Sequence, residues 1–314
     1  MVPPARQLVL GAATAPDGRM RALWRFVLGL LVVILANFAA GFVASGAGYG
    51  RRFELVFRPL ALGFALAGFV LLARTADGRE GDLASYLGLP RKRWLRDLFW
   101  GMLLGFGMVF VAVHTIYFVG DLTRNVYLNR RAFELAAVEL VILAAGAAME
   151  EVMFRGYPFQ RLVESAGPVA ATVVLSGLFG LAHLTNPNAS IWGVANTAAV
   201  GVLFCLAYLR TRSLWMPIGI HFAWNTSLGL VFGLPVSGLR GFSVIVRSKA
   251  EGPLWLTGGA YGIEASAVGT VVISLGIAAV VFLVKERSKF VPVNAANLEG
   301  METTDGNRAE SIQT

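Results

Sequence analysis

A cluster of charged residues closes an apolar stretch in the middle of the chain, and its spacing could support acid–base chemistry. Glu150 and Glu151 are adjacent, so on a helix their side chains point about 100° apart. Glu151 and Arg155 are four residues apart and share one helical face, where they can form an ion pair. Glu150 is then free to act as a general base or acid, because apolar surroundings raise the proton affinity of a carboxylate. An ordinary ion pair at a helix end explains this motif equally well.

Two further motifs repeat the four-residue spacing with histidine. Phe179 and His183 lie late in one apolar stretch, and His221 and Asn225 lie inside another. Taken singly, each histidine is more typical of a hydrogen bond between membrane helices than of catalysis. If the three motifs converge, their carboxylates, imidazoles and amide form a pocket suited to activating water and stabilising an oxyanion. The third histidine of the chain, His114, has no acidic or amide neighbour at helical spacing, and we expect it to be structural.

The segments that carry these motifs are apolar enough to cross a membrane. Hydrophobic residues make up 56% of the 314 residues and charged residues 15%, against about 25% charged in average soluble chains. The single cysteine, Cys205, excludes an intrachain disulfide and is expected to be a buried apolar side chain. We therefore predict an all-α, polytopic transmembrane helix bundle of about eight spans. The expected spans are Ala22–Val43, Pro59–Leu72, Leu98–Val119, Leu135–Met153, Val169–His183, Ile191–Leu209, Leu214–Leu234 and Ala265–Val284.

The distribution of lysine and arginine predicts the topology. These residues are more frequent in the connections on the side of the N-terminus, which places both termini in the cytoplasm, with the plasma (inner) membrane of a bacterial cell as the expected location. Because the basic residues flank apolar segments, the net charge of +8 indicates membrane anchoring and not nucleic-acid binding. The polar, basic segment Gly78–Asp97 either lies along the inner membrane surface or is a plain connecting loop.

The predicted domain organisation has four parts. Residues 1–130 hold three N-terminal membrane spans and a basic cytoplasmic loop, and residues 131–234 form the catalytic core. Residues 235–290 contain an outer loop and the last span, and residues 291–314 form a disordered polar tail.

The order Glu-Glu-x-x-x-Arg, Phe-x-x-x-His, His-x-x-x-Asn on successive apolar segments resembles the CPBP family, the group of CAAX prenyl proteases and bacteriocin-processing or self-immunity proteins. The resemblance covers roughly Ala136–Leu230, and no motif position departs from the pattern. It implies an intramembrane endopeptidase that hydrolyses a peptide bond near the membrane, in a prenylated (CAAX-type) or other membrane-associated peptide. It also implies a cavity that faces the cytoplasm and opens to the lipid.

The resemblance further implies a role for each motif residue. Glu150 would activate the attacking water, and His183 would be its partner in proton transfer. His221 and Asn225 would hold the water and stabilise the oxyanion, and Phe179 would pack against the site.

Glu151 and Arg155 would support the site, with Arg155 orienting a carboxylate or the helix end. A catalytic zinc ion usually has three protein ligands, and the residues that could supply them are Glu150, His183 and His221. Asn225 is a poor zinc ligand and the chain lacks a closely spaced histidine pair, so glutamate-based hydrolysis without a metal is favoured, with zinc left open.

Two other functions fit parts of the pattern. A non-catalytic self-immunity or peptide-binding protein would keep the same helices and cavity. A proton-coupled transporter would also use membrane carboxylates and histidines, but transporters tend to have matched halves, whereas the polar motifs here gather in one half of the chain. The expected partners are a peptide or lipidated-protein substrate and membrane lipid, with no nucleic acid.

Overall fold

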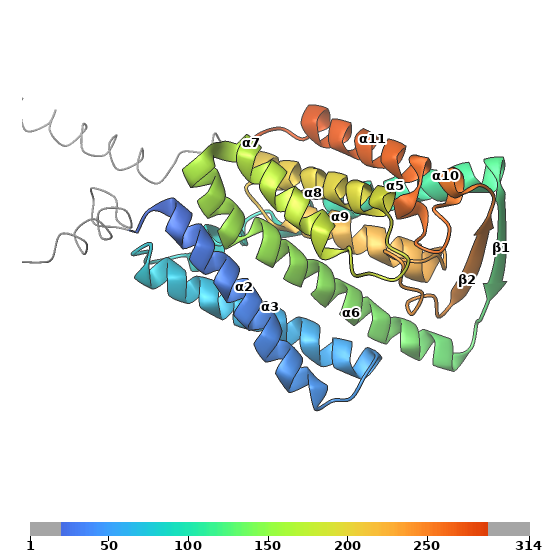
Figure 1. Cartoon of the computed structure of the whole chain (residues 1–314), viewed down its shortest axis with the longest axis horizontal. Helices are drawn as coiled ribbons and strands as arrows, with labels where there is room; N and C mark the ends of the chain where they lie inside the picture. Colours follow the sequence, from blue (N-terminus) through green and yellow to red (C-terminus); the bar gives the residue numbers. More distant parts are fainter. Residues whose placement is uncertain (1–19, 288–314) are drawn as a thin grey trace, which may run out of the picture.

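The computed structural model describes residues 20–287 and shows a bundle of long helices (Figure 1). The long helices are α2 (Ala22–Ser45), α3 (Arg51–Thr75), α5 (Trp94–Val119), α6 (Arg130–Arg155), α7 (Tyr157–Ala182), α8 (Ile191–Thr211), α9 (Trp215–Thr226) and α11 (Ala267–Leu283). The shorter elements are α4 (Leu83–Tyr86), the π-helical turn η1 (Ser227–Val231), α10 (Leu254–Thr257) and the 3-10 turn η2 (Ile263–Ala265). The predicted membrane helix bundle is thus confirmed, whereas the predicted tail 291–314 lies outside the described residues.

Several helices have the dimensions of membrane spans. Within residues 20–287, five stretches are long and apolar enough to cross a membrane, and α11 is a shorter apolar helix. One of the five, Arg130–Ala182, comprises both α6 and α7. The eight long helices follow the order of the eight expected spans, but the number that crosses the membrane stays a prediction.

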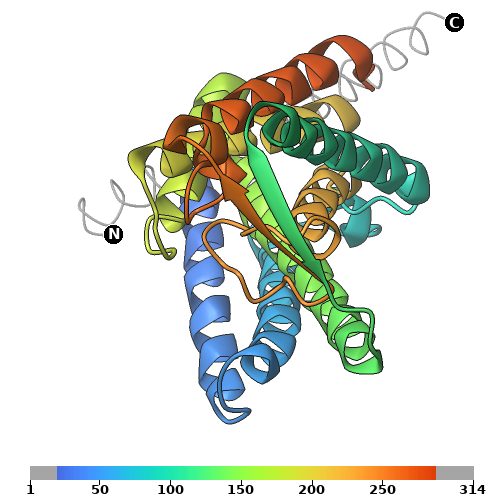
Figure 2. The same ribbon diagram turned by 90° about the vertical axis from the view of Figure 1, so that its right-hand side faces the viewer.

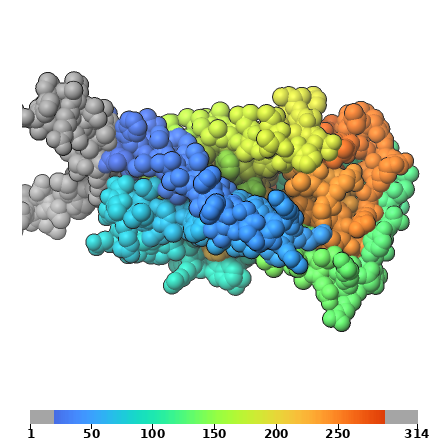
Figure 3. Space-filling view, turned by 60° about the horizontal axis from the view of Figure 1, so that its bottom comes forward, coloured from blue at the N-terminus to red at the C-terminus, as the bar shows by residue number. Residues whose placement is uncertain are grey.

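The apolar core has two parts that meet at α6, α7 and α8. The larger cluster lies mainly among α5, α8, α9 and α11, and the second lies mainly among α2, α3, α6 and α7. Figure 3 shows α2 and α3 covering one face of the bundle, with a hollow beside them, between α7 and the connection that follows α9. Helices α6, α7, α8 and α9, which carry or surround the motifs, are therefore enclosed by α2 and α3 from the N-terminal part of the chain and by α11 from the C-terminal part.

Two connections pair as a small antiparallel sheet across one end of the bundle (Figure 2). The strands are β1 (Asp121–Val126) and β2 (Val246–Glu251), in a register that runs from Asp121 opposite Glu251 to Val126 opposite Val246. The side chains of β1 are mostly exposed and show no alternating apolar pattern. Those of β2 alternate between exposed charged residues and the less exposed Val246, Ser248 and Ala250, a run too short and too polar to predict a strand from sequence.

Small residues bring α5 and α9 into close contact. At Gly101 and Gly105 of α5, an added Cβ atom would collide with the backbone of Met216 and Ile220 in α9. Such close approach is typical of packed membrane helices. It fixes the position of α9 and hence of His221, which follows Ile220 directly.

Helix α7 bends sharply at Gly167, which has a φ of 84° and a ψ of 165° and precedes Pro168. The left-handed φ is accessible to glycine without a Cβ penalty, and proline starts the second arm. This arm, residues 168–182, is roughly 22 Å long at 1.5 Å per residue. The bend explains how His183 returns to the level of Glu150, although the expected spans placed the two residues at opposite ends of neighbouring helices.

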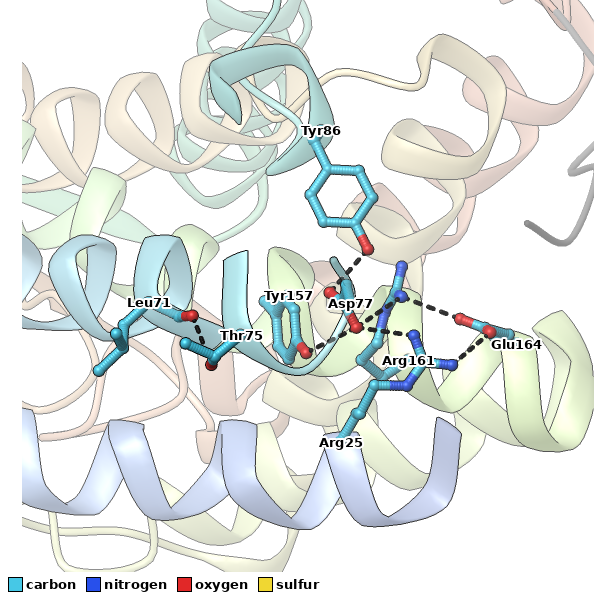
Figure 4. Close-up of polar contacts among 8 residues, drawn as sticks. All are labelled: Arg25, Leu71, Thr75, Asp77, Tyr86, Tyr157, Arg161 and Glu164. Carbon is cyan, nitrogen blue, oxygen red and sulfur yellow. Dashed lines mark hydrogen bonds and ion pairs between the residues drawn. The ribbon is translucent and has the colours of Figure 1, made fainter. Parts of the chain in front are cut away.

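A buried polar network lies at the end of the bundle opposite the sheet, around Asp77 (Figure 4). The Asp77 carboxylate accepts hydrogen bonds from Arg25 at 2.7 Å, from the Tyr86 hydroxyl at 2.7 Å and from the Tyr157 hydroxyl at 3.2 Å. Arg25 also donates to Glu164 at 2.6 Å, and Glu164 pairs at 3.0 Å with Arg161, which lies in α7 as Glu164 does. The network thereby links α2, the connection after α3, and α7.

The basic segment Gly78–Asp97 packs against the bundle. Leu87 is buried, the carbonyl of Gly88 accepts from the Leu214 amide at 2.7 Å, and the carbonyl of Pro90 accepts from the Trp215 indole at 3.0 Å. The segment is therefore not a free loop, and its position along the membrane surface stays a prediction. It is a structured connection that holds the start of α9.

Candidate active site

His221 stands between the two adjacent glutamates of α6. Its Nδ1 lies 2.9 Å from Oε1 of Glu151, and its Nε2 lies 3.8 Å from Oε2 of Glu150. The Glu151 side chain is fully buried, whereas 23% of the Glu150 side chain is exposed. The two carboxylates thus have different surroundings, as their divergent directions on one helix predict.

Arg155 holds the Glu151 carboxylate from the opposite side. Its guanidinium is fully buried and donates to Oε1 of Glu151 at 3.4 Å and to the carbonyl of Gly201 at 3.3 Å. The guanidinium also lies over the rings of Phe179 and Phe204, at 4.3 and 5.1 Å from their centres. The predicted pair between Glu151 and Arg155 is present, and Oε1 of Glu151 lies between Arg155 and His221.

Phe204 of α8 is a site residue that the sequence analysis missed. Its ring stacks on the imidazole of His221, with ring centres 5.1 Å apart and planes 17° apart. Phe179 meets the same imidazole edge-on at 6.3 Å. Because Phe204 lies in a plain apolar stretch of α8, no signal in the sequence distinguishes it from other core residues.

His183 lies just after α7, and its Nδ1 is 2.8 Å from the carbonyl oxygen of Phe179. Its ring contacts the Phe179 ring, with 4.8 Å between centres. If Nδ1 carries the hydrogen of that bond, Nε2 is left to accept or release a proton. The four-residue spacing of Phe179 and His183 therefore orients the imidazole, as well as placing both residues on one face.

One cavity of about 140 Å³ brings the predicted catalytic residues together. Glu150, His183, His221 and Asn225 all line it, so the three motifs converge. Glu151 does not line the cavity, which corrects the expectation of a pocket with both adjacent carboxylates. It lies behind His221 and acts on the cavity only through that imidazole.

The second carboxylate of the cavity is Glu264, from the turn η2. It is buried and accepts hydrogen bonds from the Trp224 indole at 3.0 Å, from the Ser237 hydroxyl at 3.1 Å and from the Ser237 amide. Burial raises the pKa of the Glu264 carboxyl above its ordinary value, although these donors oppose the shift. Glu264 lies in the segment predicted as an outer loop, where a single acidic residue carries no catalytic signal.

The cavity extends from Glu150 toward the connection after η1, where Val236, Leu239 and Phe242 line it. The lysine and arginine distribution places this connection outside the cell. The resemblance implies a cavity that faces the cytoplasm. The two expectations disagree for this cavity, and the orientation of the protein stays a prediction.

Glu150 and His221 are spaced so that a water molecule can lie between them. Oε2 of Glu150 is buried without a hydrogen-bond partner, and a separation of 3.8 Å from His221 Nε2 suits a bridging water. Among residues 20–287, no three His, Cys, Asp or Glu side chains are grouped closely enough to share a metal ion. The possible zinc ligands Glu150, His183 and His221 are therefore not grouped closely enough in this structure to share an ion, and metal dependence stays a prediction.

Comparisons with known proteins identify the same region of the chain. Residues 131–227 match the family described as "Type II CAAX prenyl endopeptidase Rce1-like". The chain is 30% identical over 95 residues to the Bacillus subtilis protein named "Putative membrane peptidase YdiL", an alignment that covers 29% of this chain and 37% of YdiL. It is 25% identical over 161 residues to "Uncharacterized protein YyaK" of the same organism, covering 48% of this chain and 53% of YyaK.

The chain thus spans about half or less of the length of these relatives, and no solved structure gives a significant match. The matched region contains all three motifs and ends two residues after Asn225. The resemblance indicated by the motifs is confirmed for this region: residues 131–227 are similar to the Rce1-like CAAX prenyl endopeptidases, and part of the chain is similar to a putative membrane peptidase.

Proposed function

We propose that this integral membrane protein is an endopeptidase that hydrolyses a peptide bond at membrane depth, in a prenylated or other membrane-associated peptide. The observation that carries the proposal is the convergence of Glu150, His183, His221 and Asn225 on one cavity. The match of residues 131–227 to a CAAX endopeptidase family supports it. We further propose cytoplasmic termini and a bacterial inner membrane as the location.

Glu150 is the proposed base. A water molecule between Glu150 Oε2 and His221 Nε2 loses a proton to the carboxylate as its oxygen attacks the carbonyl carbon of the substrate. General-base catalysis of this kind typically contributes about 10²- to 10⁴-fold in rate.

Glu151 fixes the tautomer and direction of His221. A hydrogen on Nδ1 is donated to Glu151 at 2.9 Å, so Nε2 faces the cavity and accepts a hydrogen bond from the water. Asn225, one helical turn after His221, presents an amide that can donate to the oxyanion. Both side chains are fixed on α9 before the substrate arrives, and such preorganisation is the condition for effective electrostatic stabilisation.

His183 is the proposed carrier of the proton to the leaving amine. It lines the same cavity as Glu150, and its Nδ1 is engaged by the Phe179 carbonyl. The proton taken by Glu150 passes through His183 Nε2 to the amine nitrogen as the C–N bond breaks. The products are a carboxylic acid, which keeps the second hydrogen of the water, and an amine; they exchange that proton to become a carboxylate and an ammonium group, and both side chains return to their starting states.

The test is cleavage by the purified protein in detergent of a panel of prenylated and plain apolar peptides, with and without a strong chelator. Cleavage that survives the chelator supports the glutamate mechanism. Cleavage that is lost to the chelator and restored by zinc would instead make Glu150, His183 and His221 metal ligands. Binding of a peptide without cleavage, unchanged in Glu150→Gln, would favour the non-catalytic peptide-binding function.

A further inference from the structure

A second, much larger hollow lies between α5 and α11 and shares no lining residue with the catalytic cavity. Its volume is about 960 Å³, at the upper end of the range of roughly 300–1,000 Å³ for ligand pockets. Figure 2 shows α5 and α11 close together near the sheet and further apart toward their other ends. We call this hollow the α5–α11 groove.

The walls of the α5–α11 groove are apolar over most of their length. Leu103 and Val111 of α5 face it, as do Val272 and Leu275 of α11. Thr211 is one of its few uncharged polar lining residues, and its hydroxyl already donates to the carbonyl of Ala207. A peptide would find few hydrogen-bond partners for its backbone here, and an unpaired backbone group is costly in apolar surroundings. The groove therefore suits a hydrocarbon chain.

Charged residues gather at the wide end of the groove. They are Arg93, Arg96, Asp97, Lys285, Glu286 and Arg287. Asp97 is buried and is neutralised by Arg287, which donates to it at 2.6 Å and through a second, shorter hydrogen bond. Of the other charged residues, three are cations and one is a glutamate, so this end is positive. We call it the mouth of the groove. Trp100 also lines this end, and tryptophan is enriched where a membrane meets water.

We propose that the α5–α11 groove binds one anionic phospholipid. An acyl chain lies between α5 and α11, and the phosphate and its headgroup lie against Arg93, Arg96 and Lys285. The positive mouth distinguishes an anionic lipid from a zwitterionic one, because basic residues near a membrane surface attract the negative headgroups of anionic lipids. This site is separate from the proposed peptidase chemistry.

Gly107 offers a direct way to block the acyl part of the groove. It lines the groove, and an added Cβ atom at this position would meet no atom within 4 Å. Gly107→Leu therefore projects a side chain into the groove without displacing the protein. Gly63 of α3 is equally unobstructed and lies outside the groove, so Gly63→Leu is the matched control.

The charged end has its own matched pair of variants. The mouth variant carries Arg93→Gln, Arg96→Gln and Lys285→Gln. The control carries Arg91→Gln and Lys92→Gln, two exposed residues of the same connection that do not line the groove. Both sets are checked for folding by far-UV circular dichroism before lipid is added.

The experiment titrates delipidated full-length protein with phosphatidylglycerol or phosphatidylcholine of the same acyl composition and counts bound lipid by native mass spectrometry. We expect one tightly held phosphatidylglycerol on the wild type, with an affinity that falls roughly 10- to 100-fold in the mouth variant. Gly107→Leu should lose the bound lipid, and both controls should keep it. Equal binding of the two lipids, or binding that neither the mouth variant nor Gly107→Leu weakens, would overturn the proposal. Displacement of the lipid by inorganic phosphate alone would assign the mouth to a free anion and would also overturn it.

Discussion

Replacement of Arg155 by methionine tests how the site holds its buried charge. Arg155 and Glu151 are both fully buried, and the guanidinium makes hydrogen bonds to Glu151 and to the carbonyl of Gly201. Loss of one partner from a buried ion pair typically costs about 3–5 kcal/mol, because the other charge is left uncompensated. His221 still donates to Glu151 in the variant, so we expect a loss near the lower end, about 3 kcal/mol. Loss of a neutral hydrogen bond between membrane helices would cost only about 0.6 kcal/mol on average, so the measured loss distinguishes a buried charge pair from an ordinary hydrogen bond.

The assay is the free energy of unfolding in mixed micelles, titrated with sodium dodecyl sulfate and followed by circular dichroism. A double-mutant cycle combines Arg155→Met with Glu151→Gln, which removes both charges. The double variant should lose less than the sum of the single losses, with a coupling of about 1–3 kcal/mol. Arg74→Met is the control, because Arg74 is an exposed arginine in the last turn of α3; we expect a change within about 0.5 kcal/mol.

A loss for Arg155→Met no larger than that for Arg74→Met would refute the reasoning. So would strictly additive losses in the double variant. Either result would mean that Glu151 is neutral or solvated in the protein, and that Arg155 does not orient it.

Three further predictions concern packing, the Asp77 network and pH. Gly201→Ala should lower the cleavage rate by roughly 10- to 100-fold with little unfolding, because its Cβ would lie 2.9 Å from the Ser176 backbone and 3.1 Å from the Arg155 guanidinium; an unchanged rate would contradict this. Asp77→Ala should lower the free energy of unfolding by about 3 kcal/mol, since it leaves the buried Arg25 and Arg161 to share the single carboxylate of Glu164; a loss below about 1 kcal/mol would show that the network is solvated. Burial raises the pKa of Tyr86 from 10.0 to about 12, so its stabilisation is complete below pH 10 and is lost as the pH rises toward 12. Tyr86→Phe should reduce this alkaline loss in a pH series of unfolding measurements, and an identical pH profile would argue against it.

The order and type of the helices could be predicted because apolar length is a strong signal. Some of the residues at which helices begin could not be predicted. The second span was expected to start at Pro59, yet α3 begins at Arg51, because Glu54 and Arg58 pair at 2.6 Å along the helix and lower the cost of its polar first turns. The sheet of β1 and β2 was not predicted, because its pairing joins strands far apart in sequence and its side chains are mostly exposed.

Some residues of the candidate site could be predicted from the sequence and others could not. Each motif carried its own signal, so Glu150, His183 and His221 could be singled out from the sequence. Their convergence on one cavity was only a condition there, because it depends on the bend of α7 at Gly167, which the expected spans did not contain. Phe204 and Glu264 could not be singled out, because their contribution arises only from tertiary packing against α9. The position of Glu151 behind His221 also depends on how α6 is rotated against α9, and the spacing of residues along one helix does not determine that rotation.

The central claim, that Glu150 activates the water, is tested most directly by comparing Glu150→Gln with Glu134→Gln. Glu134 lies on the same helix, but its side chain is 59% exposed and pairs with a surface arginine. With a peptide that the wild type cleaves, we expect Glu150→Gln to lose at least about 10²-fold in kcat, with peptide binding and unfolding unchanged, and Glu134→Gln to retain full activity. Full activity of folded Glu150→Gln would contradict the account.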